Sequence, residues 1–429
     1  MRVASRKLTP GNFRARLRRL CPPAGRQSQH FALAVSGGAD SLSLLVLAAQ
    51  AKTDKLDFTV LTFDHKLRAG STAVAETVLK TAEKFGLAAH KLSRPGAKPK
   101  ASLQSAARAA RYDALLGWCA KNDADGLIVA HHLEDQAETF LLRLARGSGL
   151  DGLSAMQAVS ERENSVLIRP FLDVHQAELH AVLKGHKVIP FEDPSNADTR
   201  FQRVAFRRSK AAFDALGLTS VRLAETADRL QKARHVLEAL AADQMAELIR
   251  VDACGVISGD KAGLQALPED VALRVLRGLL ATHRPYPPRQ VAVDRLYQLI
   301  VKGETGRKTL AGQIVSVKKT VVEIYREPAD IDATSQNLPK GKKIVWDQRF
   351  EIMVSRKATG RFRVMPLGID GLKWARETGV PLPKLPSKAL HGLPCVKQVL
   401  NGKTPGKPVA VARILTHPHI SFGVLPRKT

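Results

Sequence analysis

The sequence predicts a doubly wound parallel α/β domain, followed by a mostly helical middle domain and a small, basic α+β C-terminal domain. Three observations lead to this prediction. From residue 31 to about residue 191, short apolar runs alternate with longer helical patterns; residues 218–248 form one long amphipathic run; and residues 331–429 carry 18 Lys and Arg against 5 Asp and Glu. The expected domains are 1–216, 217–328 and 335–429.

The elements of the first domain follow from its apolar runs. Strands are expected at 32–35, 58–63, 88–92 and 127–130, and helices at 73–85 and 102–121. In a doubly wound sheet, ligands bind at the carboxyl ends of the strands. The residues that follow strands 32–35 and 127–130 are therefore the first candidates for a site.

The rest of the chain has weaker patterns. Leucine and alanine recur at helical spacing over 218–248, which predicts a long connecting helix. Residues 268–325 mix helix with two short strands, 313–317 and 320–325. After a polar stretch, strands are expected at 343–346 and 350–354.

Composition narrows the choice of partners. The 429 residues contain 67 Lys and Arg against 40 Asp and Glu, a net charge of +27, with a pI near 10.2. Such a charge favours a polyanion, and nucleic acid is preferred over a membrane because no apolar stretch reaches the ~20 residues that span a bilayer. The N-terminus has no hydrophobic core of the secretory kind, so we expect a cytoplasmic protein without a membrane partner.

The four cysteines are Cys21, Cys119, Cys254 and Cys395. They are scattered and form no C-x-x-C pair, so we expect no zinc site, no iron–sulfur cluster and no disulfide framework.

A glycine-rich turn follows the first strand: Ser36-Gly37-Gly38-Ala39-Asp40-Ser41, which leads into an apolar helix. Two glycines leave room for an anion next to backbone N–H groups, and the helix N-terminus adds partial positive charge there. Asp40 would repel a bare phosphate, which indicates Mg²⁺ or another bridging cation. The alternative is an ordinary turn with a capped helix.

A second polar cluster follows the strand at 127–130: His131-His132-Leu133-Glu134-Asp135-Gln136-Ala137-Glu138-Thr139. If a helix starts near Leu133, Asp135 and Glu138 share one face beside His131, and two such carboxylates can hold an amine or a metal. H-E-x-x-H, the zinc pattern, is absent. Helix capping by Glu134 and Asp135 explains one acid there but not three acids with two histidines.

Arginines form the third group of candidates. Arg108 and Arg111 lie three apart in the helical block 102–112, and an arginine facing a nucleotide would stabilise charge on its α-phosphate. Arg203, Arg207 and Arg208 follow the polar turn at 192–199, and Arg361 and Arg363 belong to the basic tail. In each case the alternative is a solvated basic surface without a specific partner.

Taken in order, these blocks resemble the tRNA(Ile)-lysidine synthases, a family of N-type ATP pyrophosphatases with a Rossmann-like fold. The shared patterns are S-G-G-x-D-S at 36–41, H-x-L-R at 65–68, A-R-x-x-R-Y at 107–112, H-H-x-D-D-Q-x-E-T at 131–139, R-P-F at 169–171 and E-D-x-S-N-x-D at 192–198. Two positions depart from the family: Glu134 stands where Asp is usual, and Val204 where Asn is usual.

The resemblance implies ATP-dependent attachment of L-lysine to C2 of the wobble cytidine in the CAU anticodon of tRNA(Ile), through an adenylated cytidine. It implies that residues Ser36 to Ser41 bind ATP and that Asp40 positions Mg²⁺ through pyrophosphate. It further implies that Asp135 and Glu138 bind the lysine, that His131 is a candidate base and that Arg111 faces the nucleotide. Arg203, Arg207, Arg208, Arg361 and Arg363 would contact the tRNA. The oligomeric state stays open, with a homodimer as one option.

Two other functions are weighed against this one. A tRNA thiolase on the same loop needs paired cysteines, which the sequence lacks. A non-catalytic RNA-binding protein predicts a basic surface without an intact set of acids, so Asp135 and Glu138 disfavour it.

Overall fold

The computed structural model describes residues 8–23, 25–64, 70–93, 103–162, 165–191, 202–281, 288–400, 404–411 and 420–424. The chain divides into two compact units, Met1–Arg234 and His235–Thr429, and each is described by itself. In these ranges no helix has both the length and the apolar character needed to cross a membrane.

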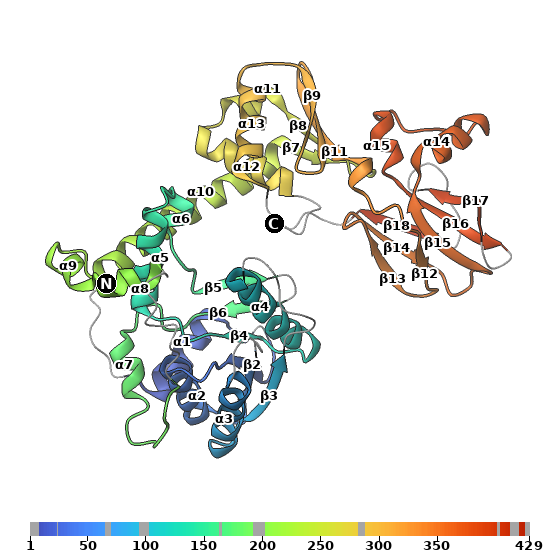
Figure 1. The fold of residues 1–429 in the computed structure, drawn as a ribbon. Helices are drawn as coiled ribbons and strands as arrows, with labels where there is room; N and C mark the ends of the chain where they lie inside the picture. Colours follow the sequence, from blue (N-terminus) through green and yellow to red (C-terminus); the bar gives the residue numbers. More distant parts are fainter. Residues whose placement is uncertain are drawn as a thin grey trace. The chain divides into compact units, whose positions relative to one another are not determined.

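Unit 1 contains the predicted doubly wound sheet, in the order β3-β2-β1-β4-β6-β5 (Figure 1). Its strands are β1 Gln29–Ala34, β2 Leu56–Asp64, β3 Ala88–Ser93, β4 Gly126–Ile128, β5 Val159–Arg162 and β6 Ser165–Ile168. All neighbours are parallel except β5 and β6. The strand order reverses at β1, which pairs with β2 on one side and with β4 on the other, so the crevice expected for ligands lies between the ends of β1 and β4.

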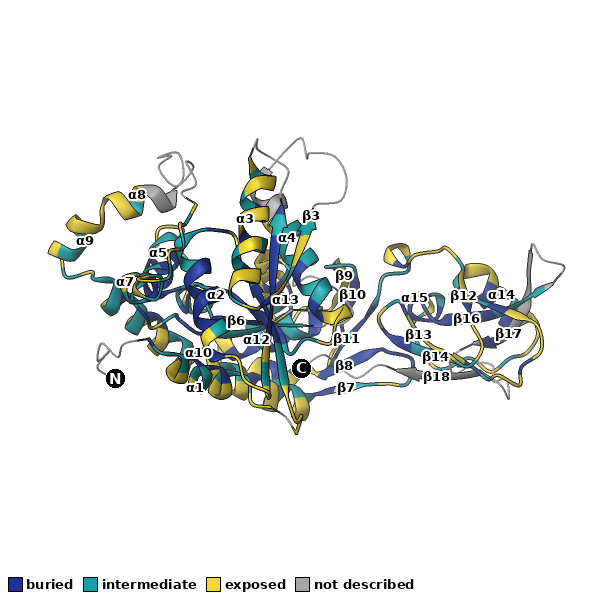
Figure 2. Cartoon of the chain, turned by 90° about the horizontal axis from the view of Figure 1, so that it is seen from below, coloured by how far each residue is buried: buried dark blue, intermediate teal, exposed yellow. Residues whose placement is uncertain are grey.

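Helices cover both faces of this sheet because neighbouring strand residues point to opposite sides. Phe31 and Leu33 of β1 pack in one buried cluster with α1, α2 and α3, whereas Ala32 belongs to a second cluster with Leu115 and Cys119 of α4. Most residues of α2 belong to the first of these clusters, so this helix is almost entirely buried (Figure 2). The helices of unit 1 are α1 Pro10–Leu20, α2 Ala39–Ala51, α3 Ser71–Lys84, α4 Leu103–Lys121, α5 Leu133–Leu144, α6 Leu150–Leu153, α7 Gln176–Ala181, α8 Gln202–Arg208 and α9 Lys210–Ala215.

The predicted connecting helix is α10, Ser220–Leu248, which begins in unit 1 and ends in unit 2. The first part of unit 2 has an antiparallel sheet in the order β7-β8-β11-β10-β9, with three helices packed on it. The bounds are β7 Ile249–Val251, β8 Ile257–Asp260, α11 Lys261–Ala266, α12 Glu269–Ala281, α13 Gln290–Val301, β9 Gly306–Leu310, β10 Gln313–Val317 and β11 Val321–Arg326. Strands β10 and β11 match the prediction, whereas β7, β8 and β9 are short and their apolar pattern does not identify them.

The last part of unit 2 is a small α+β region with two antiparallel sheets, β12-β15-β16-β17 and β13-β14-β18, which share one buried cluster. Its elements are η2 Pro328–Asp330, β12 Gln336–Leu338, β13 Lys343–Trp346, β14 Phe350–Val354, β15 Arg361–Pro366, α14 Gly368–Glu377, α15 Ser387–His391, β16 Pro394–Leu400, β17 Thr404–Val411 and β18 Ile420–Val424. The predicted strands 343–346 and 350–354 are β13 and β14.

Candidate active site

The glycine-rich loop lies between β1 and α2, at the carboxyl edge of the sheet. Gly37 has φ +91°, and a Cβ there would lie 2.8 Å from Cγ1 of Val74. Gly38 has an ordinary φ of −74° and is the N-cap of α2; of the described atoms, none lies within 4 Å of the position that its Cβ would take. The loop therefore presents backbone without side chain at a helix N-terminus, which suits a phosphate group.

The loop is closed by serine hydroxyls. Ser41 Oγ donates a hydrogen bond to the Gly38 carbonyl at 2.9 Å and accepts one from the Ser36 N–H at 3.2 Å. In the next turn, Ser43 Oγ donates to the Ala39 carbonyl at 2.8 Å. These contacts hold the loop in shape before any ligand binds.

The first turn of α5 places the second predicted cluster at the end of β4. Helix α5 starts at Leu133, and the His132 N–H donates to Asp135 Oδ2 at 3.2 Å, so Asp135 caps its own helix. Asp135 and Glu138 are each only 8% exposed. Burial of two carboxylates this close together calls for a cationic partner.

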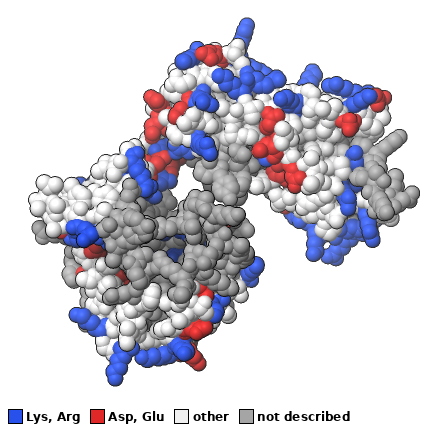
Figure 3. Space-filling model, in the orientation of Figure 1, with Lys and Arg blue, Asp and Glu red and all other residues white. Residues whose placement is uncertain are grey.

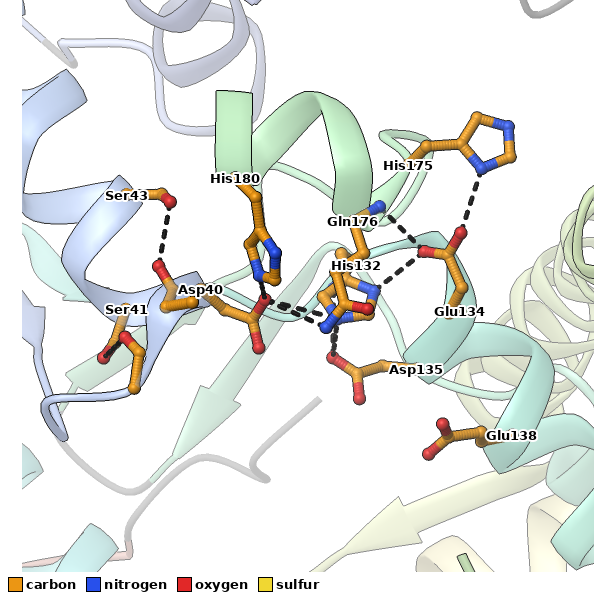
Figure 4. A network of polar contacts seen from close by, with 12 residues as sticks. Asp40, Ser41, Ser43, His132, Glu134, Asp135, Glu138, His175, Gln176 and His180 are labelled. Atoms are coloured by element: carbon orange, nitrogen blue, oxygen red, sulfur yellow. Dashed lines mark hydrogen bonds and ion pairs between the residues drawn. The ribbon is translucent and has the colours of Figure 1, made fainter. Parts of the chain in front are cut away.

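One buried imidazole joins the two clusters (Figure 4). Nε2 of His132 lies 3.7 Å from Asp40 Oδ1 and 3.6 Å from Asp135 Oδ2. The same oxygen of Asp40 accepts hydrogen bonds from His180 Nε2 at 2.7 Å and from Gln176 Nε2 at 3.2 Å, both on α7. The acid of the glycine-rich loop and the acids of α5 thus belong to one polar network.

Glu134 stabilises this network through hydrogen bonds to His132 and to the start of α7. It accepts hydrogen bonds from His132 Nδ1 at 3.0 Å, from His175 Nδ1 at 2.9 Å and from the Gln176 N–H at 2.9 Å. Burial alone would raise the pKa of Glu134, but these three hydrogen bonds outweigh burial and lower its pKa to about 2. Burial opposes a charge on His132, yet the hydrogen bond to Glu134 and the charges of Asp135 and Asp40 raise its pKa above the ordinary value.

Glu138 faces an arginine from another helix. Arg207 of α8 donates to both carboxylate oxygens of Glu138, with 2.5 Å from Nε to Oε1 and 3.3 Å from the NH2 group to Oε2. The NH2 group also lies 3.9 Å from Asp135 Oδ1. These hydrogen bonds and charges outweigh partial burial and raise the pKa of Arg207. The structure thus brings a predicted tRNA-binding residue onto the two predicted lysine-binding acids.

His131 lies three residues after the end of β4, in an unfavourable setting for a positive charge. Burial lowers its pKa, and although the charge of Asp135 opposes this, the guanidinium groups of Arg169, Arg108 and Arg111 reinforce it, so the pKa falls to about 3. Its ring is therefore neutral at neutral pH in the free protein. A base with so low a pKa takes up a proton weakly.

Arg111 lies on α4, where its guanidinium stacks 5.3 Å from the centre of the Tyr112 ring. Its Nε and the Nδ1 of His131 are buried and have no hydrogen-bond partner in the described part of the chain. Unpaired buried polar atoms are uncommon, and two near one site are a feature that a bound ligand would satisfy.

The remaining predicted residues are spread over the chain. Arg208 is exposed on α8, and Arg361 is exposed at the start of β15. Arg363 is half-buried and donates from Nε to Asn337 Oδ1 at 2.9 Å. The side chain of Arg203, that of Val204, and the segments 65–69 and 192–201 lie outside the described residues.

Unit 2 carries a basic surface near β12 and β13, where Lys and Arg side chains gather in Figure 3. Exposed residues in this region are Lys340, Lys342, Lys343, Arg356, Lys357 and Arg361. We call these six residues the basic patch of unit 2.

Sequence reasoning missed the part of the site that α7 supplies. His175, Gln176 and His180 hold Asp40 and Glu134, but they follow the R-P-F motif without a pattern of their own. The only available signal was the pair of histidines five residues apart, close after that motif. In the described ranges, no group of three or more His, Cys, Asp or Glu side chains is arranged to hold a metal ion by itself.

Comparison with known proteins adds an independent line of evidence. Residues 11–211 match the family model of the PP-loop domain. The tRNA(Ile)-lysidine synthase of Methylobacterium nodulans is 39% identical over 337 residues, which cover 76% of this chain and 98% of that protein. The tRNA(Ile)-lysidine synthase of Ruegeria pomeroyi is 32% identical over 356 residues, 81% of this chain and 83% of that protein.

Among solved structures, the chain is similar to the U34-tRNA thiolase NcsA from Methanococcus maripaludis, with 15% identity and a TM-score of 0.44 over 52% of this chain and 79% of that one. The relatives in sequence are far closer and are matched over most of their length. On the strength of the 39% identity over nearly all of one such relative, the chain belongs to the tRNA(Ile)-lysidine synthase family.

Proposed function

We propose that this protein uses ATP to join L-lysine to C2 of the wobble cytidine in the CAU anticodon of tRNA(Ile), which gives lysidine, AMP and diphosphate. One observation carries the proposal: a single buried side chain, His132, contacts both the acid of the phosphate loop and an acid of the α5 pair. Nucleotide chemistry and amine binding can therefore take place side by side. Because ATP and tRNA are cytoplasmic, we place the enzyme in the cytoplasm.

In the first step, O2 of the cytidine attacks the α-phosphorus of ATP and diphosphate leaves. The loop from Ser36 to Ser41 would hold the departing diphosphate through backbone N–H groups at the start of α2. Arg111, whose buried Nε has no hydrogen-bond partner among the described residues, would pair with charge on the nucleotide. Bonding to phosphorus turns the C2 oxygen into a good leaving group.

Asp40 would take part through Mg²⁺. It is the loop's only carboxylate and its side chain is 37% exposed, and a Mg²⁺ site built from one or two carboxylates and substrate phosphates needs no dedicated cage. When bound, the ion neutralises charge on the phosphates. His180 and Gln176 fix the Asp40 carboxylate that would face it.

In the second step, the ε-amine of lysine attacks C2, the C2–oxygen bond breaks and AMP leaves. Asp135 and Glu138 would receive the lysine as an ammonium ion, which must lose a proton before nitrogen can attack. The low pKa of His131 in the free protein makes it a weak proton acceptor until negative charge from the nucleotide arrives. Because it lies between the end of β4 and the start of α5, His131 remains a candidate base together with Asp135 and Glu138.

The cysteines support this reaction over sulfur transfer. Cys119, Cys254 and Cys395 are buried, and burial raises the pKa of Cys119 to about 11 and that of Cys395 to about 12. Thiols in this state are poor nucleophiles.

The test is incubation of the full chain with ATP, Mg²⁺, radiolabelled lysine and an unmodified tRNA(Ile) transcript with a CAU anticodon. We expect incorporation that disappears when the wobble cytidine is replaced by uridine. Asp40→Ala should abolish turnover and leave tRNA affinity nearly unchanged. Retained lysine transfer in that variant, or incorporation into the uridine transcript, would contradict the proposal.

A further inference from the structure

The guanidinium of Arg207 lies where a substrate amine is expected. It bridges both oxygens of Glu138 and reaches Asp135. The two carboxylate side chains are only 10% and 11% exposed, whereas that of Arg207 is 45% exposed. A cation supplied by the chain itself therefore balances the charge of Glu138 and part of the field of Asp135.

The contact has consequences for a second cation. Both oxygens of Glu138 already accept charge-assisted hydrogen bonds, which are the stronger class of hydrogen bond. An ammonium ion that entered beside the guanidinium would meet a like charge in a partly desolvated site. Arg207 and a substrate ammonium thus compete for Glu138.

Arg207 also has access to a different partner. Its neighbours Ala205 and Arg208 are exposed, so this part of α8 presents two arginines to the surroundings. A guanidinium binds a phosphate in the same bidentate manner as a carboxylate, and RNA supplies phosphates at high local density. An RNA backbone at α8 would compete with Glu138 for Arg207.

We infer that Arg207 is a placeholder for the substrate amine: it occupies Glu138 in the free enzyme and releases it when tRNA phosphates bind α8. The inference rests on the proposed function, because it takes Asp135 and Glu138 as the lysine site. Its consequence is an order of events in which lysine binds well only once tRNA is present. Lysine then does not occupy the site until a cytidine is present to react with its amine.

The experiment is equilibrium dialysis of radiolabelled lysine against the full chain, with and without unmodified tRNA(Ile) transcript. In the natural protein, we expect the transcript to tighten lysine binding by about tenfold, the size of one good ionic contact. Arg207→Ala should bind lysine without transcript as tightly as the natural protein does with it. Arg207→Gln, which keeps a shorter, uncharged polar side chain, should behave in the same way, and Arg207→Lys should keep part of the competition.

The matched control is Lys210→Ala. Lys210 lies three residues further along and pairs with Asp214 at 2.5 Å instead of with the site acids, so its removal should leave the transcript effect in place. Circular dichroism and thermal unfolding identify any variant that does not fold, and the other Arg207 variants then decide the outcome.

Two results overturn the inference. Weaker lysine binding in Arg207→Ala and Arg207→Gln would mean that the guanidinium assists the amine. If the transcript tightens lysine binding equally in these variants and in the natural protein, the guanidinium does not compete with the amine. If the natural protein transfers lysine in the turnover assay, either result contradicts only the placeholder role of Arg207. If the natural protein neither binds nor transfers lysine, both the placeholder role and the proposed function are wrong.

Discussion

At the scale of single residues, the site is a set of acids whose charges are balanced by histidine and arginine. Glu134 is the clearest case, because it accepts hydrogen bonds from two imidazoles and one backbone N–H although no substrate is expected to reach it. Its side chain contacts both His132, the N-cap of α5, and His175, the N-cap of α7. We regard Glu134 as a positioning residue.

Glu134→Gln should therefore lower stability in a pH-dependent manner. A carboxylate whose pKa falls on folding from 4.5 to about 2 stabilises the folded state above pH 4.5, and this contribution is lost as the pH falls towards 2. Allowing for partial exposure, we expect a loss of about 1–2 kcal/mol at pH 7 and a smaller one at pH 3.

Urea unfolding at both pH values measures the effect, with Glu83→Gln on the exposed side of α3 as control. An equal difference between the natural protein and Glu134→Gln at pH 7 and pH 3 would show that the carboxylate charge is not what stabilises the fold. The signal for this residue in the sequence was its place in H-H-x-D-D-Q-x-E-T. Its partners on the chain around α7 lie 41 and 42 residues away, and the sequence does not indicate them.

At the scale of elements, the β1 loop and α2 form the part of the site that sequence predicts best. Two glycines in a row after an apolar strand indicate a phosphate loop. In the structure these two glycines differ in conformation and in surroundings. Gly37 has a positive φ and lies against Val74 of α3, whereas at Gly38 no atom of the described residues lies within 4 Å of the Cβ position.

Alanine at these two positions should separate folding from ligand binding. Gly37→Ala combines a strained φ with a close contact to Val74, so we expect a loss of about 1–3 kcal/mol in stability together with weaker ATP binding. Gly38→Ala should change stability by less than about 0.5 kcal/mol, yet its methyl group would stand between the backbone and the diphosphate. Urea unfolding and calorimetric titration with ATP measure the two effects, and equal destabilisation by both substitutions would argue against this loop geometry.

The strands that sequence did not identify have a common physical property. β5 and β6 have four residues each, and β7 has three, so none is long enough to show a clear alternation of apolar and polar residues. Strands β5 and β7 pair with the next strand in the chain, whereas β6 also pairs with β4 and β8 also pairs with the more distant β11. Long, strongly apolar elements such as β2 and α2 were predicted within a few residues.

At the scale of the whole molecule, the net charge of +27 predicts a polyanion but does not locate its binding surface. The structure shows exposed basic side chains on α8 in unit 1 and in the basic patch of unit 2. The three-domain division and the homodimer stay predictions of the sequence.

Binding of tRNA should be strongly dependent on salt. Each phosphate contact contributes a slope of about −0.7 to −0.9 to the plot of log affinity against log salt concentration. Replacing Lys340, Lys342 and Arg361 by Ala should therefore reduce the slope by about 2 to 3 if the basic patch binds the tRNA backbone. Filter binding between 50 and 200 mM salt measures the slope.

Lys318→Ala serves as control, because Lys318 pairs with Glu323 at 2.6 Å elsewhere in unit 2. An unchanged slope in the triple variant would show that the basic patch does not bind the tRNA backbone. Lysine transfer at low salt should persist in both variants, since neither touches the network around Asp40.

The sequence by itself determined the glycine-rich loop, the acids of α5 and the parallel sheet that places them, because each depends on neighbouring residues or on the local period of apolar side chains. Only the tertiary structure decided that His132 contacts Asp40 and Asp135 together, that α7 supports the network, and that Arg207 covers Glu138. These contacts join residues up to 140 positions apart. They depend on the strand order β1-β4 and on the packing of α8 against α5, which no short stretch of sequence specifies.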